Sequence, residues 1–385
     1  MKKRFLRDIA EIQTGPFGSQ LHKEDYVDVG TPIVTVEHLG SRVFSEQNLP
    51  MVSDADKSRL SKYVLKKGDI VFSRVGSVDR CSFVDQKHDG WMFSGRCLRV
   101  RPSEEVDPLF LYYFFCLNTT KEFVRSIAVG ATMPSINTKL LGEVEVLCPE
   151  IEEQRKIADI LSKIDDKIEE NQKINENLAV LLQTVYQERF GDVDIAAKQG
   201  VLSDICSYSK DRVAVSELDV TTYFSTENML PRKAGSTDAT SLPTTPQTTA
   251  CHKGDTLISN IRPYFKKIVY CEDECGCSTD VLCFTPNQPQ YSAYLFSTLY
   301  ADKFFAFMVA GAKGTKMPRG DKQHIMTYPI VLPSEVALVE FNTIALPLIK
   351  QIYSNRAENK RLSLLRDTLL PKLMSGELDV SDIDL

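Results

Sequence analysis

An internal repeat restricts what this chain can fold into more than any other feature. Residues 93–190 align with residues 277–374 without a gap, at a constant offset of 184 positions. Further upstream, KKGDIVFS at 66–73 matches HKGDTLIS at 252–259. Each copy must build the same unit, and a single core rarely grows beyond roughly 250–300 residues. The 385 residues are therefore expected to form two similar domains.

Each copy begins with a mixed part that is rich in short β-type runs. Residues 1–149 and 200–333 carry β-branched and aromatic clusters separated by Gly, Pro, Asp and Asn, which is typical of strands and turns. One amphipathic helix is expected in each mixed part, over 108–127 and 292–309. The Thr-, Ser- and Pro-rich segment 226–250 is expected to be a loop or a mobile insertion.

Each copy ends with a helical part that has a heptad seam. We expect a central long helix with a linker over 150–199, a C-terminal long helix over 334–376 and an acidic tail over 377–385. Seam residues recur in alternating steps of four and three, as in a coiled coil. In the first helix they are Ile157, Leu161, Ile164, Ile168, Asn171, Asn175, Leu178, Leu182 and Val185, and the offset gives Phe341, Ala345, Leu348, Ile352, Asn355, Asn359, Leu362, Arg366 and Leu369 in the second.

Two seam asparagines occupy equivalent places in the two helices. Antiparallel pairing would place Asn171 opposite Asn359 and Asn175 opposite Asn355, so that the amides satisfy one another and fix the register. The mixed domains would then lie at opposite ends of a rod, related by a pseudo-twofold axis. The 29 residues of 157–185 span roughly 43 Å as a helix, slightly more than one DNA turn of roughly 34–36 Å. Alternatively, each helix covers only its own domain.

These features together predict an α+β protein with two β-rich mixed domains and an antiparallel helix pair. Pro347 lies inside the second helix and should kink or restart it. With 43% apolar and 25% charged residues, the composition is that of a soluble globular protein. No secretion signal or membrane span is expected, since charges interrupt both the N-terminal segment and the apolar stretch 294–312.

The ten cysteines are dispersed, which favours reduced thiols in the cytoplasm over a disulfide scaffold. Cys271, Cys275, Cys277 and Cys283 form the one dense group, and their spacing is unlike the paired CxxC of zinc ribbons. Buried thiols on strands are favoured over zinc there. The five histidines are scattered, so no metal site is predicted.

Five long segments carry a resemblance to a known family, in the order in which that family has them. The chain resembles the DNA-specificity (S) subunit of Type I restriction-modification systems. The resembling segments are PFGSQLHKEDY at 16–26, GDIVFSRVGSVDR at 68–80, EEQRKIADILSKIDDKIEENQKINENL at 152–178, GDTLISNIRPYFKK at 254–267 and RDTLLPKLMSGELDV at 366–380.

The resemblance implies a non-catalytic subunit that binds double-stranded DNA. Each of its two target-recognition domains would read one half of a bipartite, asymmetric sequence, while the helices set the spacer and dock two methyltransferase subunits. Restriction subunits would join through these, and the partners would use S-adenosylmethionine, ATP and Mg, with no cofactor bound by this chain. Independently, the sequence has no GxxxxGK[ST] loop, no GxGxxG after a strand and no Asn-Pro-Pro or Asp-Pro-Pro motif.

Candidate DNA contacts are basic and amide residues in three sets of glycine-containing loops. They could equally be solvated or structural loops, and Arg262 could instead pair with Asp255 or Asp280. The first set is Lys313, Lys316, Arg319 and Lys322, with Thr132, Ser135, Asn137 and Lys139 at the repeat; the second is Arg74, Ser77 and Arg80, with Asn260, Arg262, Tyr264, Lys266 and Lys267; the third is Ser19, Gln20, His22 and Lys23.

The charge distribution bears on these alternatives. The net charge of −6 is unusual for a DNA-binding protein, but residues 1–149 carry 20 basic and 19 acidic residues and residues 200–333 carry 13 of each. The acidic excess lies on the helical parts, which should face protein partners. Alone, the chain is expected to bind DNA weakly. Two other functions stay open: the specificity subunit of a methylation-only system, and a coiled-coil scaffold for proteins.

Overall fold

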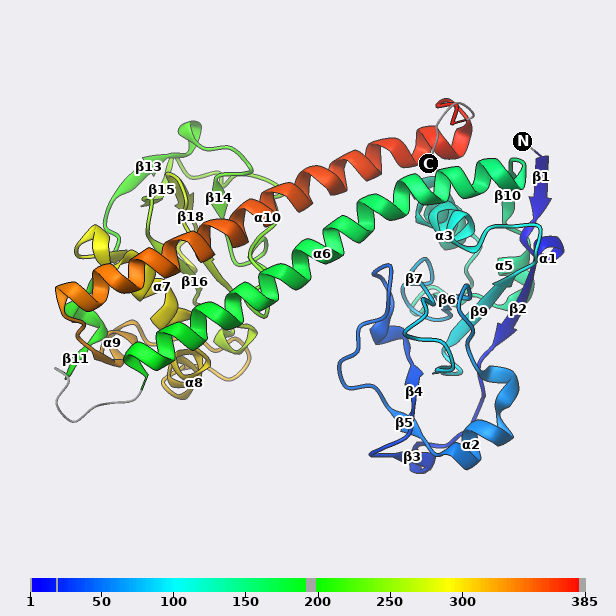
Figure 1. Cartoon of the computed structure of the whole chain (residues 1–385), viewed down its shortest axis with the longest axis horizontal. Coiled ribbons are helices and arrows are strands. Elements are labelled where there is room, and N and C mark those ends of the chain that lie inside the picture. The colour runs from blue at the N-terminus through cyan, green and yellow to red at the C-terminus, as the bar shows by residue number, and fades with distance from the viewer. Residues whose placement is uncertain (1, 19, 192–198, 381–385) are drawn as a thin grey trace. The chain divides into compact units, whose positions relative to one another are not determined.

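The computed structural model describes residues 2–18, 20–191 and 199–380, and it divides into two compact units (Figure 1). Unit 1 contains Met1–Glu169 and Asn359–Leu385, and unit 2 contains Glu170–Glu358. Both long helices, α6 (Ile151–Phe190) and α10 (Glu335–Ser375), contribute one segment to each unit. Each unit is therefore one mixed domain together with parts of both helices.

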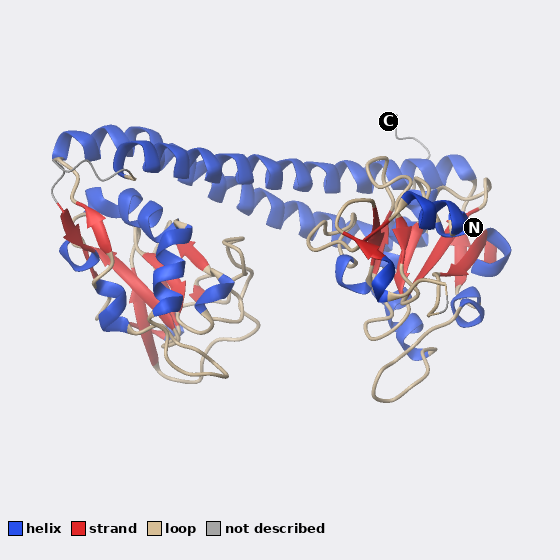
Figure 2. Cartoon of the chain, turned by 90° about the horizontal axis from the view of Figure 1, so that it is seen from below, coloured by secondary structure: helices blue, strands red, loops and turns tan. Residues whose placement is uncertain are grey.

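The main sheet has the same topology in the two units, which confirms the repeat and the α+β class. All neighbouring strands in it are antiparallel. Figure 2 shows these strands grouped beside the long-helix segments within each unit. In sheet order the strands are β2 (Ala10–Thr14), β9 (Cys97–Pro102), β6 (Ile70–Ser73) and β7 (Cys81–Phe83) in unit 1, and β12 (Cys206–Tyr208), β19 (Val281–Pro286), β16 (Thr256–Ser259) and β17 (Ile268–Tyr270) in unit 2.

A smaller sheet in each unit contains one parallel pair, β4 with β8 and β14 with β18. Residues 247–250 belong to β15, so the expected loop over 226–250 is wrong at its end, where Thr248 and Ala250 are buried. Minor pairs join β1 (Lys2–Phe5) to β10 (Glu145–Cys148) and β11 (Gln199–Val201) to β20 (Pro329–Val331). The smaller sheets contain β3 (Tyr26–Val27), β5 (Met51–Val52), β4 (Thr31–Val34) and β8 (Met92–Phe93), and β13 (Arg212–Ala214), β15 (Gln247–Cys251), β18 (Cys275–Cys277) and β14 (Tyr223–Phe224).

The single helix expected in each mixed domain is wrong, because two helices form there. Unit 1 has α3 (Pro108–Cys116) and α4 (Asn118–Ser126), and unit 2 has α7 (Ser292–Tyr300) and α8 (Asp302–Ala310). The intervening residues, Leu117 and Ala301, have ψ values of 134° and 142°, which end the first helix. Asn and Asp are favoured at helix starts, and they begin the second one. The short helices are α1 (Leu6–Ile9), α2 (Asp54–Arg59), α5 (Thr138–Gly142) and α9 (Lys322–Met326).

The long helices pair through their predicted seam within each unit. In unit 2, Asn355 Nδ2 donates to Asn175 Oδ1 at 2.9 Å, as expected, and Asn171 donates to Glu358 at 2.8 Å. In unit 1, Asn359 donates to the Ile168 carbonyl at 3.1 Å. The pairing of Asn171 with Asn359 stays a prediction.

Pro347 does not restart the second helix, since α10 continues over 41 residues, and a kink at Pro347 stays a prediction. Ala345 and Ile349, on either side of the proline, are buried in the unit 2 core, and this packing compensates for one missing backbone hydrogen bond. By length and composition α10 could also cross a membrane. One such helix is weak evidence for a membrane span, and the buried residues of α10 belong to the cores of the two units.

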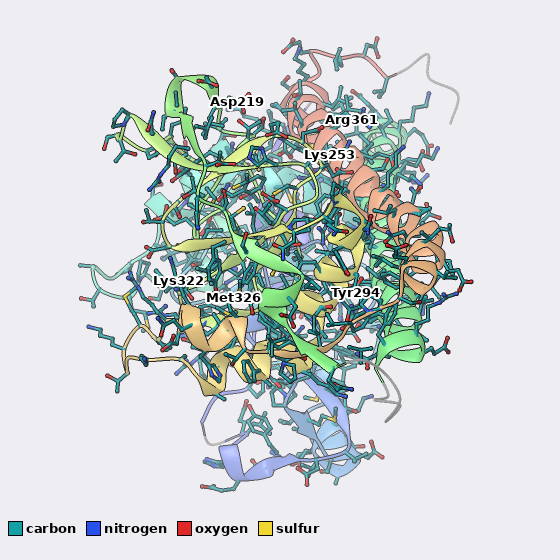
Figure 3. The ribbon with its side chains drawn as sticks, turned by 90° about the vertical axis from the view of Figure 1, so that its left-hand side faces the viewer. Asp219, Lys253, Tyr294, Lys322, Met326 and Arg361 are labelled. Atoms are coloured by element: carbon teal, nitrogen blue, oxygen red, sulfur yellow. The ribbon has the colours of Figure 1, made fainter. Side chains whose placement is uncertain are left out.

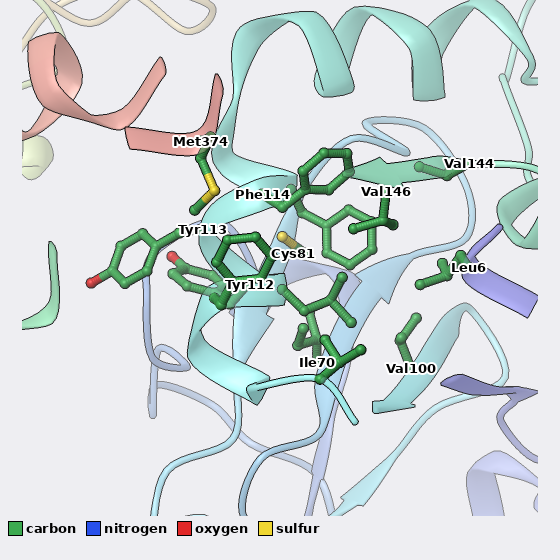
Figure 4. Packing of buried hydrophobic residues seen from close by; sticks show 14 of the residues in the cluster. Leu6, Ile70, Cys81, Val100, Tyr112, Tyr113, Phe114, Val144, Val146 and Met374 are labelled. Atoms are coloured by element: carbon green, nitrogen blue, oxygen red, sulfur yellow. The ribbon is translucent and has the colours of Figure 1, made fainter. Parts of the chain in front are cut away.

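The core of each unit is closed by a helix segment from the other sequence repeat. In unit 1, Tyr112 and Phe114 of α3 pack between the main sheet and Met374 of α10 (Figure 4). In unit 2, Tyr186 and Phe190 of α6 pack against the aromatic residues of α7 and α10. Burying each such side chain stabilises a core by roughly 1.5–3 kcal/mol. Neither mixed domain completes its core from its own repeat alone.

A buried polar cluster distinguishes unit 1 from unit 2. Asp165 of α6 accepts hydrogen bonds from Tyr113 Oη of α3 at 2.8 Å and from Arg366 Nη1 of α10 at 2.7 Å. The repeat offset of 184 places Ser297, Ile349 and Leu182 at these three positions in unit 2. Burial, the largest single effect, lowers the pKa of Arg366, but the hydrogen bonds and charges of Asp165 and Asp367 together outweigh it and raise that pKa. The polar cluster therefore pairs α10 with α6 specifically in unit 1.

Candidate DNA interface

Two candidate loops of unit 1 lie side by side, although they are far apart in the sequence. The segment after β6 and the loop between α4 and α5 are joined by hydrogen bonds from Gly76 N to the Pro134 carbonyl at 2.8 Å and from Ile136 N to the Arg74 carbonyl at 3.0 Å. The Arg74 guanidinium also lies 4.6 Å from the centre of the Phe17 ring. Parts of all three predicted loop sets therefore meet at one place.

Unit 2 repeats this arrangement with more positive charge. Arg262 N donates to the Pro318 carbonyl at 2.8 Å, the counterpart of the bond from Gly76 to Pro134. Lys313 and Arg319 pair across the loop between α8 and α9, with both backbone hydrogen bonds at 2.9 Å. Figure 3 shows Lys322 at the start of α9, with Met326 further along the same helix. The second loop set and the first loop set thus form one surface here too.

Several predicted contact residues of unit 1 have structural partners instead. Gln20 Oε1 accepts from Tyr63 Oη at 2.7 Å, and Arg80 donates to the Leu39 carbonyl. Asn137 caps α5 by accepting from Leu140 N at 2.9 Å, and the Ser135 hydroxyl donates to the Val129 carbonyl at 3.2 Å. These groups hold the loops in place. His22, Ser77, Thr132 and Lys139 are exposed, Lys23 begins a short 3₁₀ turn, and Ser19 lies outside the described residues.

The basic residues of unit 2 divide into paired and unpaired groups. Lys266 binds Asp302 at 2.8 Å, Lys267 donates to the Thr226 carbonyl at 2.5 Å, and Arg319 binds Asp280 at 3.0 Å. Lys313 pairs with Asp321, and Lys322 lies 5.8 Å from the centre of the Tyr208 ring. Within the described part of the chain, Lys316 has no ion pair. It is therefore available to a phosphate.

The alternative in which Arg262 holds a turn through an acid is wrong. Asp280 pairs with Arg319, and Asp255 accepts instead from His252 N at 2.8 Å and Cys283 Sγ at 3.2 Å. Asn260, at the start of the same segment, is buried, and its Oδ1 has no partner among the described residues.

Carboxylates shape the charge of the unit 2 surface. The hydrogen bond from Lys313, together with backbone N–H groups of α9, lowers the pKa of Asp321 to about 2. Hydrogen bonds from Lys233 and Lys266 likewise lower the pKa of Asp302 to about 2. Both carboxylates are ionised at neutral pH and neutralise the lysines that they hold. The remaining positive charge of the interface lies on residues without such partners.

Of the exposed apolar side chains at the interface, the sequence reasoning predicted Tyr264 and missed the others, because it looked mainly for charge and amides. Tyr264 and Phe265 are 50% and 38% exposed, and their ring centres lie 4.8 Å apart. Met133 and Met317 on the loops between helices, and Phe17 beside Arg74, are also exposed. The recurrence of the Met-Pro pair at the repeat offset was the available signal. Aromatic rings of this kind can contact sugars and bases.

The cysteine group is buried beneath the smaller sheet of unit 2. Cys275 and Cys277 lie on β18 and Cys283 on β19, as expected for strand thiols, whereas Cys271 follows β17. Cys271 and Cys275 Sγ are 3.5 Å apart. Over residues 2–18, 20–191 and 199–380, no three His, Cys, Asp or Glu side chains are arranged to hold a metal ion.

Known proteins that are similar to this chain belong to the same family that the sequence motifs indicated. The family model of the Type I restriction modification DNA specificity domain matches residues 1–179. The MjaIX specificity subunit of Methanocaldococcus jannaschii is 23% identical over 407 aligned positions, which cover 98% of this chain and 93% of that protein. Residues 1–179 of the chain therefore belong to the Type I restriction-modification DNA specificity domain family. The family model describes this part of the chain as a DNA specificity domain.

Two further proteins are similar to this chain. The HindI specificity subunit of Haemophilus influenzae is 32% identical over 162 residues, or 41% of this chain, and the match spans about a third (35%) of that protein. A crystal structure of the S subunit from M. genitalium covers 97% of this chain and 95% of its own, with a TM-score of 0.62 and 17% identity. At that identity the likeness shows the shared fold of two sheet-rich domains with long helices.

Proposed function

We propose that this specificity subunit directs a Type I restriction-modification complex to a bipartite, asymmetric target in double-stranded DNA. Each mixed domain reads one half of the target with its pair of adjacent loops. The observation that carries the proposal is the equivalent loop pairing in both units, through Gly76 and Pro134 in one and Arg262 and Pro318 in the other. Because the two interfaces have the same backbone arrangement but different side chains, they would recognise two different half-site sequences.

Direct contacts with the DNA are assigned by which side chains remain available. Phosphate contacts fall to Lys316, Lys322 and Lys139, which are exposed. Groups already tied to the protein, such as Gln20, hold the loops and do not read bases. Phosphate contacts set affinity, whereas contacts to base edges set sequence preference.

The long helices are proposed to dock two methyltransferase subunits and to set the spacer between the half-sites. Apolar residues that lie outside the seam support docking, because exposed apolar side chains on a helix favour a partner. In unit 2 these include Val180 and Leu181 of α6 and Val339 of α10; in unit 1 they include Leu364 and Leu365 of α10.

The partners supply the chemistry. The methyltransferase subunits are proposed to transfer methyl groups to adenine from S-adenosylmethionine, and restriction subunits, if the system has them, to use ATP and Mg in the cytoplasm. The nearly neutral mixed domains support weak DNA binding by this chain alone, so that the partners provide much of the phosphate neutralisation.

Mapping methylated adenines across a genome tests the proposal. The full chain is expressed together with the methyltransferase of its own system, and the same strain without this chain is the control. A bipartite motif with a fixed spacer that requires this chain is the expected result. A motif that persists without the chain, or one continuous motif, would overturn the proposal. Methylation that is independent of the chain, with partner capture intact, would favour the coiled-coil scaffold instead.

A further inference from the structure

Arg262 occupies a backbone position that suits glycine. Its φ is +51°, and the equivalent residue of unit 1, Gly76, has a φ of +75°. The two are equivalent because each donates its N–H to the carbonyl of the matching proline, Pro318 or Pro134, at 2.8 Å in both cases. L-residues with side chains are disfavoured in this left-handed region, and glycine is not. Arginine at this position therefore destabilises the fold compared with glycine. A role for its side chain in binding would account for its presence.

Among the described residues, the Arg262 guanidinium has no hydrogen bond or ion pair that would compensate for the strained backbone. Its Nε is buried and has no hydrogen-bond acceptor among the described residues, and no ion pair involves its guanidinium there. Lys266 and Arg319, its neighbours in the two loops, are by contrast paired with Asp302 and Asp280. These two neighbouring cations thus have acidic partners, whereas the Arg262 guanidinium has none among the described residues.

The turn that carries Arg262 is held rigidly. Phe265 accepts a backbone hydrogen bond from Arg232 N at 2.7 Å, and Lys266 accepts one from Lys233 N at 2.9 Å. Lys233 and Lys266 also share Asp302, each at 2.8 Å. A rigid backbone fixes the direction of a long side chain and reduces the entropy lost when it binds.

We propose that Arg262 reads a guanine in the half-site bound by unit 2. The proposal rests on the function proposed above and identifies one base contact within it. A guanidinium presents parallel N–H donors that match O6 and N7 of guanine in the major groove. The exposed Tyr264 and Phe265 rings beside it contact the adjoining sugar or base, and Lys316 on the paired loop contacts a phosphate.

The test is the methylation motif of the complex containing Arg262→Gly, with Arg262→Lys and Lys316→Ala alongside it. In Arg262→Gly, the preference for guanine at one position of one half-site should fall by roughly tenfold or more, while the other half-site is unchanged. Its melting temperature should be equal to or above that of the wild type, because glycine relieves the backbone strain. Arg262→Lys should relax the same position, since an ammonium cannot replace the paired donors.

The matched control, Lys316→Ala, should reduce methylation of all sites alike and leave the motif intact. An unchanged motif in Arg262→Gly would overturn the inference. So would a lower melting temperature in Arg262→Gly together with a wild-type motif in Arg262→Lys, because that combination assigns the arginine a structural role. Failure of the proposed function itself looks different: the wild-type complex would then show no motif that depends on this chain.

Discussion

Replacing Arg366 by leucine should destabilise unit 1 by about 3 kcal/mol. Removing one partner of a buried ion pair usually costs about 3–5 kcal/mol, because the other charge stays buried without compensation. Here Asp165 is only 6% exposed, but the Arg366 side chain is 29% exposed and Tyr113 continues to donate to Asp165. These two features place the expected loss at the lower end of the range.

A triple variant separates the charge effect from a general loss of packing. Unit 2 has Leu182 and Ile349 in the equivalent positions, so the same fold accommodates apolar side chains in place of the polar cluster. Combining Tyr113→Phe, Asp165→Ile and Arg366→Leu should therefore bring stability back to within about 1 kcal/mol of the wild type, since well-packed apolar replacements of buried ion pairs are often neutral.

Trp91 provides the assay, because it is the one tryptophan of the chain and lies in unit 1. Urea unfolding followed by its fluorescence reports unit 1 separately from unit 2. Arg361→Leu, an exposed arginine on the same helix, is the control and should change stability by less than about 0.5 kcal/mol. If the free energy of unfolding lost in the triple variant equals the sum of the losses in the three single variants, the coupling between Tyr113, Asp165 and Arg366 is refuted.

Three further predictions address the seam, the interface and pH. Changing both Asn175 and Asn355 to Leu should be better tolerated than either change alone, because each single change leaves an unpaired amide. The denaturation midpoints of the three variants measure this. Equal losses of stability in all three would contradict the prediction. Lys316→Ala should lower the slope of log affinity against log salt by roughly one for DNA binding by the complex, and an unaltered slope would remove this lysine from the phosphate contacts. Asp302 has a pKa of about 2 in the folded protein, below its unfolded value, so the stability it contributes is present above about pH 4 and lost as pH falls towards 2. Because its side chain is 70% exposed the effect is small, and Asp302→Asn should differ from the wild type in melting temperature at pH 6 but not at pH 2.

The sequence was most informative where a pattern is repeated along the chain. The offset of 184 predicted the two units. The heptad spacing predicted some of the buried side chains of α6 and α10, such as Leu161 and Phe341, and the bond between Asn175 and Asn355, but it missed others, such as Tyr186 and Leu370. It failed where local backbone geometry decides the outcome. The breaks at Leu117 and Ala301 follow from one extended residue inside an apolar stretch, which periodicity does not reveal.

For the candidate interface, sequence reasoning selected the loops but not the roles of their residues. Residue type predicted Gln20 and Asn137 as possible contacts, whereas their hydrogen bonds show that they hold the loops. Those partners lie up to 43 positions away, at Tyr63 for Gln20, so no local pattern could indicate them. The strained backbone of Arg262 is likewise visible only in three dimensions, although its alignment with Gly76 was available from the repeat.

The division of both long helices between the units has a consequence for how the protein is made. Unit 2 is one continuous stretch, so it can fold as soon as Glu358 has left the ribosome. The core of unit 1 needs Leu370, Leu373 and Met374, which are synthesised after all 189 residues of Glu170–Glu358. At 5–20 residues per second that interval is roughly 10–40 s. The domain translated first is thus completed last, and its aromatic surface stays open to chaperones, or to aggregation, until the final helical turns emerge.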